Sequence, residues 1–213
     1  MKLAEGSKSW ILFAFSSGLI FLVLSLIFRE LVIGAVSFLI CICFFLLTVF
    51  FLVFFRDPDR KIGKNIVAVA DGKIREIVET ADKEAGKCTK ISTFMNIQNV
   101  HVNRMPIDGK IIDVKHFSGF HIPAFKKESE KNERVVILVE TKIGMIKIVQ
   151  IAGTLARRVV PYVKKGDTLK KGERIGIIRL GSRVDVYLPS KRVTVKVGNR
   201  VKAGEDNIAE INA

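Results

Sequence analysis

The chain has 213 residues, a mean hydropathy of +0.30 and a formal net charge of +14. This length suffices for one domain and a smaller unit, and the basic balance predicts an acidic partner. No nucleic-acid motif accompanies the charge, so the expected partner is an anionic membrane surface and not nucleic acid. The three cysteines and three histidines lack the spacing of a disulfide framework or a metal site, so neither is expected.

The first 55 residues contain two long apolar runs. Residues 10–28 and 31–55 carry no charge over 19 and 25 positions, and only Arg29 and Glu30 separate them. A helix rises ~1.5 Å per residue, so each run is long enough to cross a hydrocarbon core of ~30 Å. A cleaved signal peptide would have a shorter apolar region and no second run directly behind it. Residues 1–55 are therefore predicted to form a membrane anchor of two transmembrane helices joined by a tight turn.

Basic residues flank the two runs unevenly. Lys2 and Lys8 precede the first run, residues 56–64 contain four Lys or Arg, and the turn has only Arg29. Because the cytoplasmic flanks of membrane spans are enriched in Lys and Arg, both termini are expected on the cytoplasmic side of the cell membrane. Residues 56–65 are polar and include proline and glycine, so they are expected to link the anchor to a cytoplasmic domain.

The rest of the chain, residues 66–213, consists of short β-branched runs separated by glycine and charged residues. Such runs are typical of strands, and no helical period persists over three turns. We expect strands at residues 66–69, 73–78, 88–95, 110–116, 134–140, 145–151, 173–179, 183–188, 193–197 and 208–211. The predicted fold is mainly β: two N-terminal transmembrane helices followed by a pseudo-symmetric β-sandwich similar to a barrel-sandwich hybrid.

Two sequence patterns each occur twice in this domain. Residues 71–74 (DGKI) recur at 108–111, and residues 163–172 (VKKGDTLKKG) resemble 195–204 (VKVGNRVKAG). Two turns that are each used twice indicate internal pseudo-symmetry. The second pattern also resembles the turn of biotinyl and lipoyl carrier domains, although no lysine here has the context of their modified lysine. A non-catalytic, membrane-anchored carrier-like or adaptor module is therefore the alternative to an enzyme.

A glycine and a serine interrupt an alternating apolar pattern near the C-terminus. Ile175 and Ile177 precede the pair Gly181-Ser182, and the alternation continues over residues 184–188. A glycine inside a strand pattern marks a bulge or a place where another group approaches the backbone. A second Gly-Ser pair at residues 6–7 shows that composition alone can produce the dipeptide. The pair becomes informative only together with other segments.

From residue 54 onward, several segments match the pattern of one known family, in order and through nearly the whole remaining chain. They are 54–60 (FFRDPDR), 69–74 (VADGKI), 91–96 (ISTFMN), 99–106 (NVHVNRMP), 132–134 (NER), 150–153 (QIAG), 156–158 (ARR) and 179–189 (RLGSRVDVYLP). Together they resemble the phosphatidylserine decarboxylase family in its short membrane-bound form, whose archaeal relatives act on archaetidylserine.

The resemblance implies that the protein itself cuts the bond between Gly181 and Ser182. In this family the serine hydroxyl attacks the preceding carbonyl, and elimination from the resulting ester leaves a pyruvoyl group, the expected cofactor, on Ser182. The products would be chains of residues 1–181 and 182–213, held as a heterodimer that could dimerise further. The pyruvoyl group would be the electron sink for decarboxylating a membrane lipid, phosphatidylserine or archaetidylserine, to the ethanolamine lipid.

The resemblance also implies catalytic residues. Ser182 is the nucleophile, His101 its candidate base and Asp71 the candidate carboxylate that orients the base, as in a Ser-His-Asp arrangement. Without the resemblance, His101 would be interpreted as a packed residue of a β-rich domain, and Asp71 as part of a hairpin turn.

One position departs from the family pattern. Larger members have a second histidine three residues after the first, whereas this chain has Arg104. Either His101 serves both self-cleavage and decarboxylation, or His116 or His121 contributes to self-cleavage.

The phosphodiester and carboxylate of the substrate are anionic, so arginines are expected beside them. Arg157, Arg158 and Arg183 are the candidate substrate contacts, and an exposed charge at a strand edge is the alternative interpretation of each. The headgroup chemistry is the same for ester-linked acyl and ether-linked isoprenoid tails, so both lipids stay open.

Overall fold

The computed structural model describes residues 2–119, 131–153, 158–179, 182–189 and 192–211. The chain forms two compact units, Met1–Pro58 and Asp59–Ala213. The first is helical and the second consists of strands, which confirms the predicted mainly β fold with two N-terminal helices.

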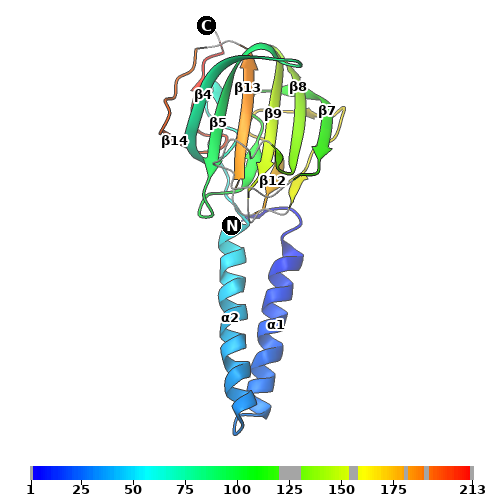
Figure 1. The fold of residues 1–213 in the computed structure, drawn as a ribbon, viewed down its shortest axis with the longest axis vertical. Coiled ribbons are helices and arrows are strands. Elements are labelled where there is room, and N and C mark those ends of the chain that lie inside the picture. The colour runs from blue at the N-terminus through cyan, green and yellow to red at the C-terminus, as the bar shows by residue number, and fades with distance from the viewer. Residues whose placement is uncertain (1, 120–130, 154–157, 180–181, 190–191, 212–213) are drawn as a thin grey trace. The chain divides into compact units, whose positions relative to one another are not determined.

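The helical unit is a pair of helices, α1 (Lys8–Ile27) and α2 (Val32–Phe54), that run side by side (Figure 1). Aromatic rings join them, with ring centroids 6.0 Å apart for Trp10 and Phe51 and 5.7 Å apart for Phe21 and Phe44. Both helices are long and apolar enough to cross a membrane, judged by length and composition. Most large apolar side chains on them are exposed, as lipid-facing residues would be.

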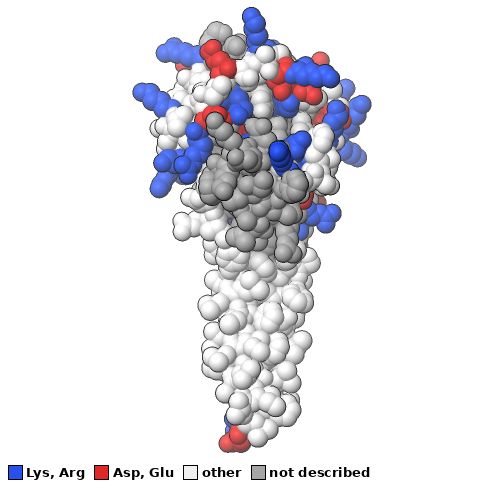
Figure 2. Space-filling model, in the orientation of Figure 1, with Lys and Arg blue, Asp and Glu red and all other residues white. Residues whose placement is uncertain are grey.

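A short antiparallel pair closes the helical unit. Strand β1 (Lys2–Leu3) pairs with β2 (Arg56–Asp57), so the segments before α1 and after α2 are bonded to each other. Strand β2 lies within residues 56–65, which the sequence predicts to be a linker. Figure 2 shows Lys and Arg side chains gathered on the β-rich unit, whereas the helices carry charge only at one end of the face shown.

The β-rich unit contains all the other strands. They are β3 (Ile66–Val67), β4 (Gly72–Asp82), β5 (Gly86–Met95), β6 (Val102–Arg104), β7 (Gly109–Phe117), β8 (Arg134–Thr141), β9 (Gly144–Ala152), β10 (Val159–Pro161), β11 (Thr168–Leu169), β12 (Arg174–Ile178), β13 (Ser182–Pro189), β14 (Arg200–Val201) and β15 (Asn207–Ala209). Eight of them form one antiparallel sheet in the order β11-β7-β8-β9-β13-β5-β4-β14. The smaller sheets β10-β12-β6 and β15-β3 complete the unit, and β13 lies between β5 and β9 in the large sheet (Figure 1).

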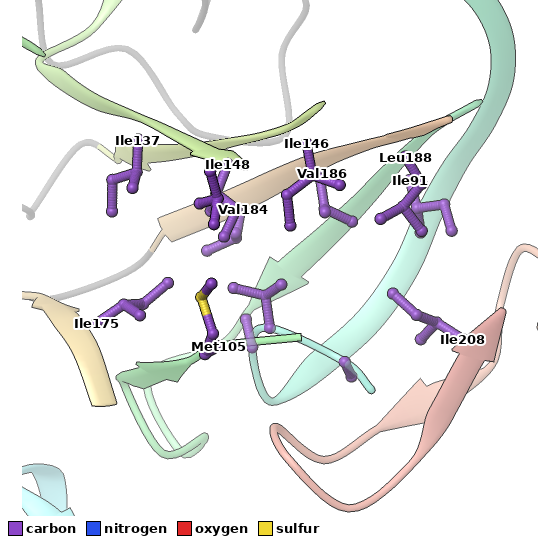
Figure 3. Packing of buried hydrophobic residues seen from close by; sticks show 14 of the residues in the cluster. Ile91, Met105, Ile137, Ile146, Ile148, Ile175, Val184, Val186, Leu188 and Ile208 are labelled. Carbon is purple, nitrogen blue, oxygen red and sulfur yellow. The ribbon is translucent and has the colours of Figure 1, made fainter. Parts of the chain in front are cut away.

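The hydrophobic core lies against one face of the large sheet. Along β13, Val184, Val186 and Leu188 are buried in this core, because alternate residues of a strand point to the same face. Met105, Ile175 and other residues from the smaller sheets and loops pack opposite them (Figure 3). Burial of each large aliphatic side chain contributes ~1.5–3 kcal/mol. We call the opposite face of the large sheet its outer face.

The two repeated sequence patterns occupy equivalent places in the fold. Asp71 Oδ1 accepts a hydrogen bond of 2.8 Å from the backbone N–H of Ala203, and Asp108 Oδ1 accepts one of 2.7 Å from that of Lys171. The pairing of β4 with β14 matches the pairing of β7 with β11. The pseudo-symmetry that the sequence predicts is therefore present in strand pairing and in hydrogen bonding.

One predicted strand is wrong. Within residues 193–197 only Val193 forms a β-bridge, to Ala209, and the segment then enters a turn. Asn199 Oδ1 accepts the N–H of Lys196 there, and Gly198 has a φ of +96°. A left-handed glycine and a side-chain bond that closes the turn override the alternating valines.

Candidate active site

Ser182 is the first residue of β13 and is fully buried on the core side of the large sheet. It pairs with Met95 at the end of β5 and with Ala152 at the end of β9. Its hydroxyl donates to Met95 Sδ at 3.2 Å. A thioether is a weak acceptor, so this contact holds the hydroxyl in place without a strong competing bond.

Two buried amides extend this contact. Asn103 Nδ2 lies 3.7 Å from Met95 Sδ, and Asn103 Oδ1 accepts a bond of 2.7 Å from Gln150 Nε2. Asn103 and Gln150 are fully buried, and Gln150 Oε1 has no hydrogen-bond partner among the residues that the structure describes. A buried amide without full pairing is costly, so the cluster of Ser182, Met95, Asn103 and Gln150 indicates a functional requirement.

The sequence interpretation missed both amides. Gln150 is a polar residue between the apolar Val149 and Ile151, and Asn103 is a polar residue between Val102 and Arg104. Both also lie within segments that carry the family resemblance. A polar residue next to apolar strand residues, within a family segment, is therefore the sequence feature that indicates each of these amides.

His101 is fully buried and precedes β6. Its Nδ1 lies 2.9 Å from the carbonyl oxygen of Asn99. A carbonyl can only accept, so Nδ1 carries the proton, and in the neutral ring Nε2 is the basic nitrogen. The His101 carbonyl accepts the N–H of Ile178 at 3.3 Å, which ties the residue to the strand just before Ser182.

Asp71 has other partners than His101. Arg60 Nη2 donates to both of its oxygens, at 2.8 and 3.1 Å, and the backbone of Ala203 donates to Oδ1. The backbone bond recurs at Asp108, so it belongs to the repeat, whereas the Arg60 pair is particular to Asp71. The role of Asp71 in orienting His101 stays a prediction.

Arg104, at the position of the family's second histidine, belongs to the scaffold, and His116, a candidate second base, lies away from Ser182. Arg104 is buried and donates to the carbonyl of Gly172 at 3.0 Å, so it supports a turn of the repeat. His116 is half-exposed on β7 and bonds Glu133 Oε1 at 3.0 Å. Strand β7 is three strands from β13, or ~14 Å at the usual spacing. His121 lies outside the described residues.

Arg183 does not point toward the Ser182 side chain. By alternation it lies on the outer face, where Nη2 contacts Asp185 Oδ2 at 3.0 Å and both residues are buried. Burial raises the pKa of Asp185, and the charge of Arg183 opposes that rise. Arg183 therefore sits in a buried ion pair, and its role in substrate binding stays a prediction.

Arg179, at the start of the segment that leads to Ser182, lies close to Arg158, which precedes β10. The Arg179 N–H donates to the Arg158 carbonyl at 3.2 Å. Burial, and then the positive charge of Arg158, lower the pKa of Arg179. Two neighbouring guanidinium groups favour an anion between them, and Arg179 is a candidate that the sequence interpretation missed. Arg157 and Gly181 lie outside the described residues.

The Ser182 hydroxyl is buried near two buried amides, and β12, the strand before it, is bonded to the backbone of the buried His101. Such an arrangement suits nucleophilic chemistry in the interior of the protein. Its other unit is a helical pair that could span a membrane. A model of the phosphatidylserine decarboxylase family matches residues 47–209, and the chain belongs to this family.

Curated relatives match either nearly the whole chain or about three quarters of it. A Methanosarcina barkeri protein named "putative archaetidylserine decarboxylase proenzyme" is 40% identical over an alignment of 213 positions that covers 98% of each chain. A protein of the same name from Methanococcoides burtonii is 41% identical over 98% of this chain and 96% of its own. The phosphatidylserine decarboxylase proenzyme of Streptomyces avermitilis is 47% identical over 157 residues, 73% of this chain and 71% of its own.

Proposed function

We propose that this protein is a self-processing, pyruvoyl-dependent decarboxylase that converts phosphatidylserine or archaetidylserine to the ethanolamine lipid. Family membership favours this activity over a carrier-like or adaptor module. The observation that carries the proposal is the buried Ser182 at the first position of the central strand β13, paired on both sides.

The proposed self-cleavage uses Ser182 and His101. The serine hydroxyl attacks the carbonyl carbon of Gly181, the bond to the Ser182 nitrogen breaks, and an ester forms. Neutral His101 is the proposed base, since its Nε2 is the basic nitrogen. Elimination from the ester releases Gly181 as a carboxylate and leaves dehydroalanine at residue 182. Its imine tautomer then takes up one water molecule and loses ammonia, which leaves the pyruvoyl group on residue 182. Water would hydrolyse the ester back to serine, so complete burial of Ser182 suits this sequence of steps.

Strand pairing supports retention of both products. Residues 182–189 pair with β5, and residues 182–187 also pair with β9. Chains of residues 1–181 and 182–213 would therefore stay bound as a heterodimer, with the new N-terminus held where Ser182 now lies. The residues there fit the group, because Ser182 is fully buried on the core side and the buried amides of Asn103 and Gln150 lie close by.

The pyruvoyl group supplies the electron sink for loss of carbon dioxide. The side chains around the pyruvoyl group would supply proton transfer, hydrogen bonds and contacts to the headgroup. We assign proton transfer to His101 and hydrogen bonding beside residue 182 to Asn103 and Gln150. Arg158 and Arg179 are the proposed contacts of the anionic headgroup, together with Arg157 and Arg183 from the sequence interpretation.

The helical pair suits a lipid substrate. Tethering keeps the β-rich unit at the bilayer, where serine headgroups are presented, and basic residues are attracted to acidic headgroups by ~1 kcal/mol each. The distribution of Lys and Arg around the helices favours a cytoplasmic location for this unit.

The direct test is release of labelled carbon dioxide from carboxyl-labelled serine lipid in mixed micelles. Wild-type protein should release it from phosphatidylserine, archaetidylserine or both, and a Ser182→Ala variant should not. Processed wild-type protein that releases none from either lipid would overturn the proposed activity.

A further inference from the structure

A polar cavity of about 350 Å³ lies beside the turn that precedes His101. Its walls include Lys73 at the start of β4, Arg200 in β14 and the turn of residues 96–99. This turn connects Met95, the partner of Ser182, to His101, whose Nδ1 bonds the Asn99 carbonyl. The cavity and the candidate active site therefore share one wall.

Two like charges face each other at this cavity. Lys73 and Arg200 are direct cross-strand partners in the pairing of β4 with β14, and both are exposed. Like charges directly opposite in an antiparallel pair are destabilising. Within the described part of the chain, neither cation forms an ion pair. An anion bound between them would convert the repulsion into two attractions.

The second half of the pseudo-symmetric domain provides an internal comparison. There the equivalent pair is Lys110 and Thr168, so the lysine recurs and the opposing arginine does not. The repeated turn thus does not require two cations. Arg200 is particular to the half that contains the cavity.

The carboxylates around the cavity have partners of their own. Asp71 is held by Arg60 and by the Ala203 N–H, and Asp206 Oδ2 accepts the Lys202 N–H at 2.7 Å. Among the described residues, neither carboxylate forms an ion pair with Lys73 or Arg200. The facing wall presents the amide residues Asn96, Gln98 and Asn99, whose groups suit phosphate oxygens.

We propose that this cavity binds the phosphate of a phospholipid, with Lys73 and Arg200 as its cations. Lys73 is paired with Phe94 and Phe94 with Arg183, so the two cations lie on the outer face, as Arg183 does, and two strand spacings, ~10 Å, from the strand that begins at Ser182. Two sources share the chemistry: the serine lipid itself and a neighbouring anionic lipid. Assignment to the serine lipid rests on the proposed function, whereas phosphate binding does not.

The test is calorimetric titration of the full chain, in a phosphate-free maltoside detergent, with glycerophosphoserine. Lys73→Gln and Arg200→Gln should each weaken binding about fivefold, as expected for partly exposed charge pairs. Lys110→Gln is the matched control from the other half of the domain and should bind as the wild type does. The titration needs no turnover, so failure of the decarboxylation assay leaves it interpretable.

A second arm uses flotation with phosphatidylglycerol vesicles. Weaker glycerophosphoserine binding in the two variants assigns the site to the serine lipid. Weaker vesicle binding alone assigns it to a neighbouring lipid and still supports phosphate recognition. Unchanged binding in both arms, or an equal loss in Lys110→Gln, overturns the proposal.

Discussion

His101 and Ser182 are both fully buried and lie on segments joined by the hydrogen bond from the Ile178 N–H to the His101 carbonyl. His101→Ala should lower lipid turnover by ~10²–10⁴-fold, the usual contribution of a general acid or base. His116→Ala is the matched control, because His116 contacts Glu133 at the surface. Gel analysis of processing and carbon dioxide release measure the two steps separately. Full processing with lost turnover would assign His101 to decarboxylation alone, and normal performance in both steps would refute both roles.

Asn103 and Gln150 depend on each other at a buried site. Asn103→Leu should lower the free energy of unfolding by ~1–3 kcal/mol, because it leaves the Gln150 amide unpaired. The double variant Asn103→Leu/Gln150→Met should recover part of that loss, since it removes both polar groups together, but turnover should stay low. Urea unfolding and the turnover assay provide the two readings. Additive destabilisation with normal turnover would contradict a shared functional role.

The tip of the β4–β5 hairpin is bonded to β9 on the outer face. Lys147 Nζ contacts Asp82 at 2.6 Å and Glu84 at 3.0 Å. Burial alone would raise the pKa of Asp82, but the Lys147 bond and the N–H groups of Ala85 and Glu84 lower it below its ordinary value of 3.8. The stabilisation is therefore complete above that value and is lost as the pH falls through the lower, folded-state pKa.

Acid should accordingly weaken this element in the wild type. The melting temperature of the wild type should fall between pH 6 and pH ~3 by more than that of Asp82→Asn, which lacks the titrating carboxylate. Thermal unfolding followed by circular dichroism at both pH values measures the difference. Equal falls in the two proteins would mean that the Asp82–Lys147 contact contributes nothing to stability.

Strand β13 connects the two proposed products. Because it is paired on both sides over most of its length, the chains of residues 1–181 and 182–213 should elute together in gel filtration without denaturant. They should separate only in urea or guanidinium. Elution of the short chain by itself under native conditions would rule out the sheet as the device that positions residue 182.

At the scale of the whole molecule, regular patterns made the fold predictable. Two uncharged runs predict α1 and α2 to within two residues, and the recurring turns predict equivalent halves. The strand at residues 193–197 could not be predicted correctly, because apolar alternation carries no information about the positive φ of Gly198.

The active site was only partly predictable, because its contacts are tertiary. The family segments point to Ser182 and His101, but no local pattern shows that Asp71 pairs with Arg60. The same holds for Asn103 and Gln150, which are 47 residues apart and meet only when β6 and β9 fold together. Arg183 is next to Ser182 in sequence, yet strand alternation turns it to the opposite face.

The central claim is that the chain cuts itself before Ser182, and intact-mass measurement of purified protein tests it most directly. The wild type should give two chains, residues 1–181 and 182–213, with the second lighter than a serine-ended fragment by the mass of ammonia. Ser182→Ala should stay a single chain of 23.8 kDa. A wild-type protein that remains one chain of unmodified mass, identical in behaviour to the Ser182→Ala variant, would contradict the account.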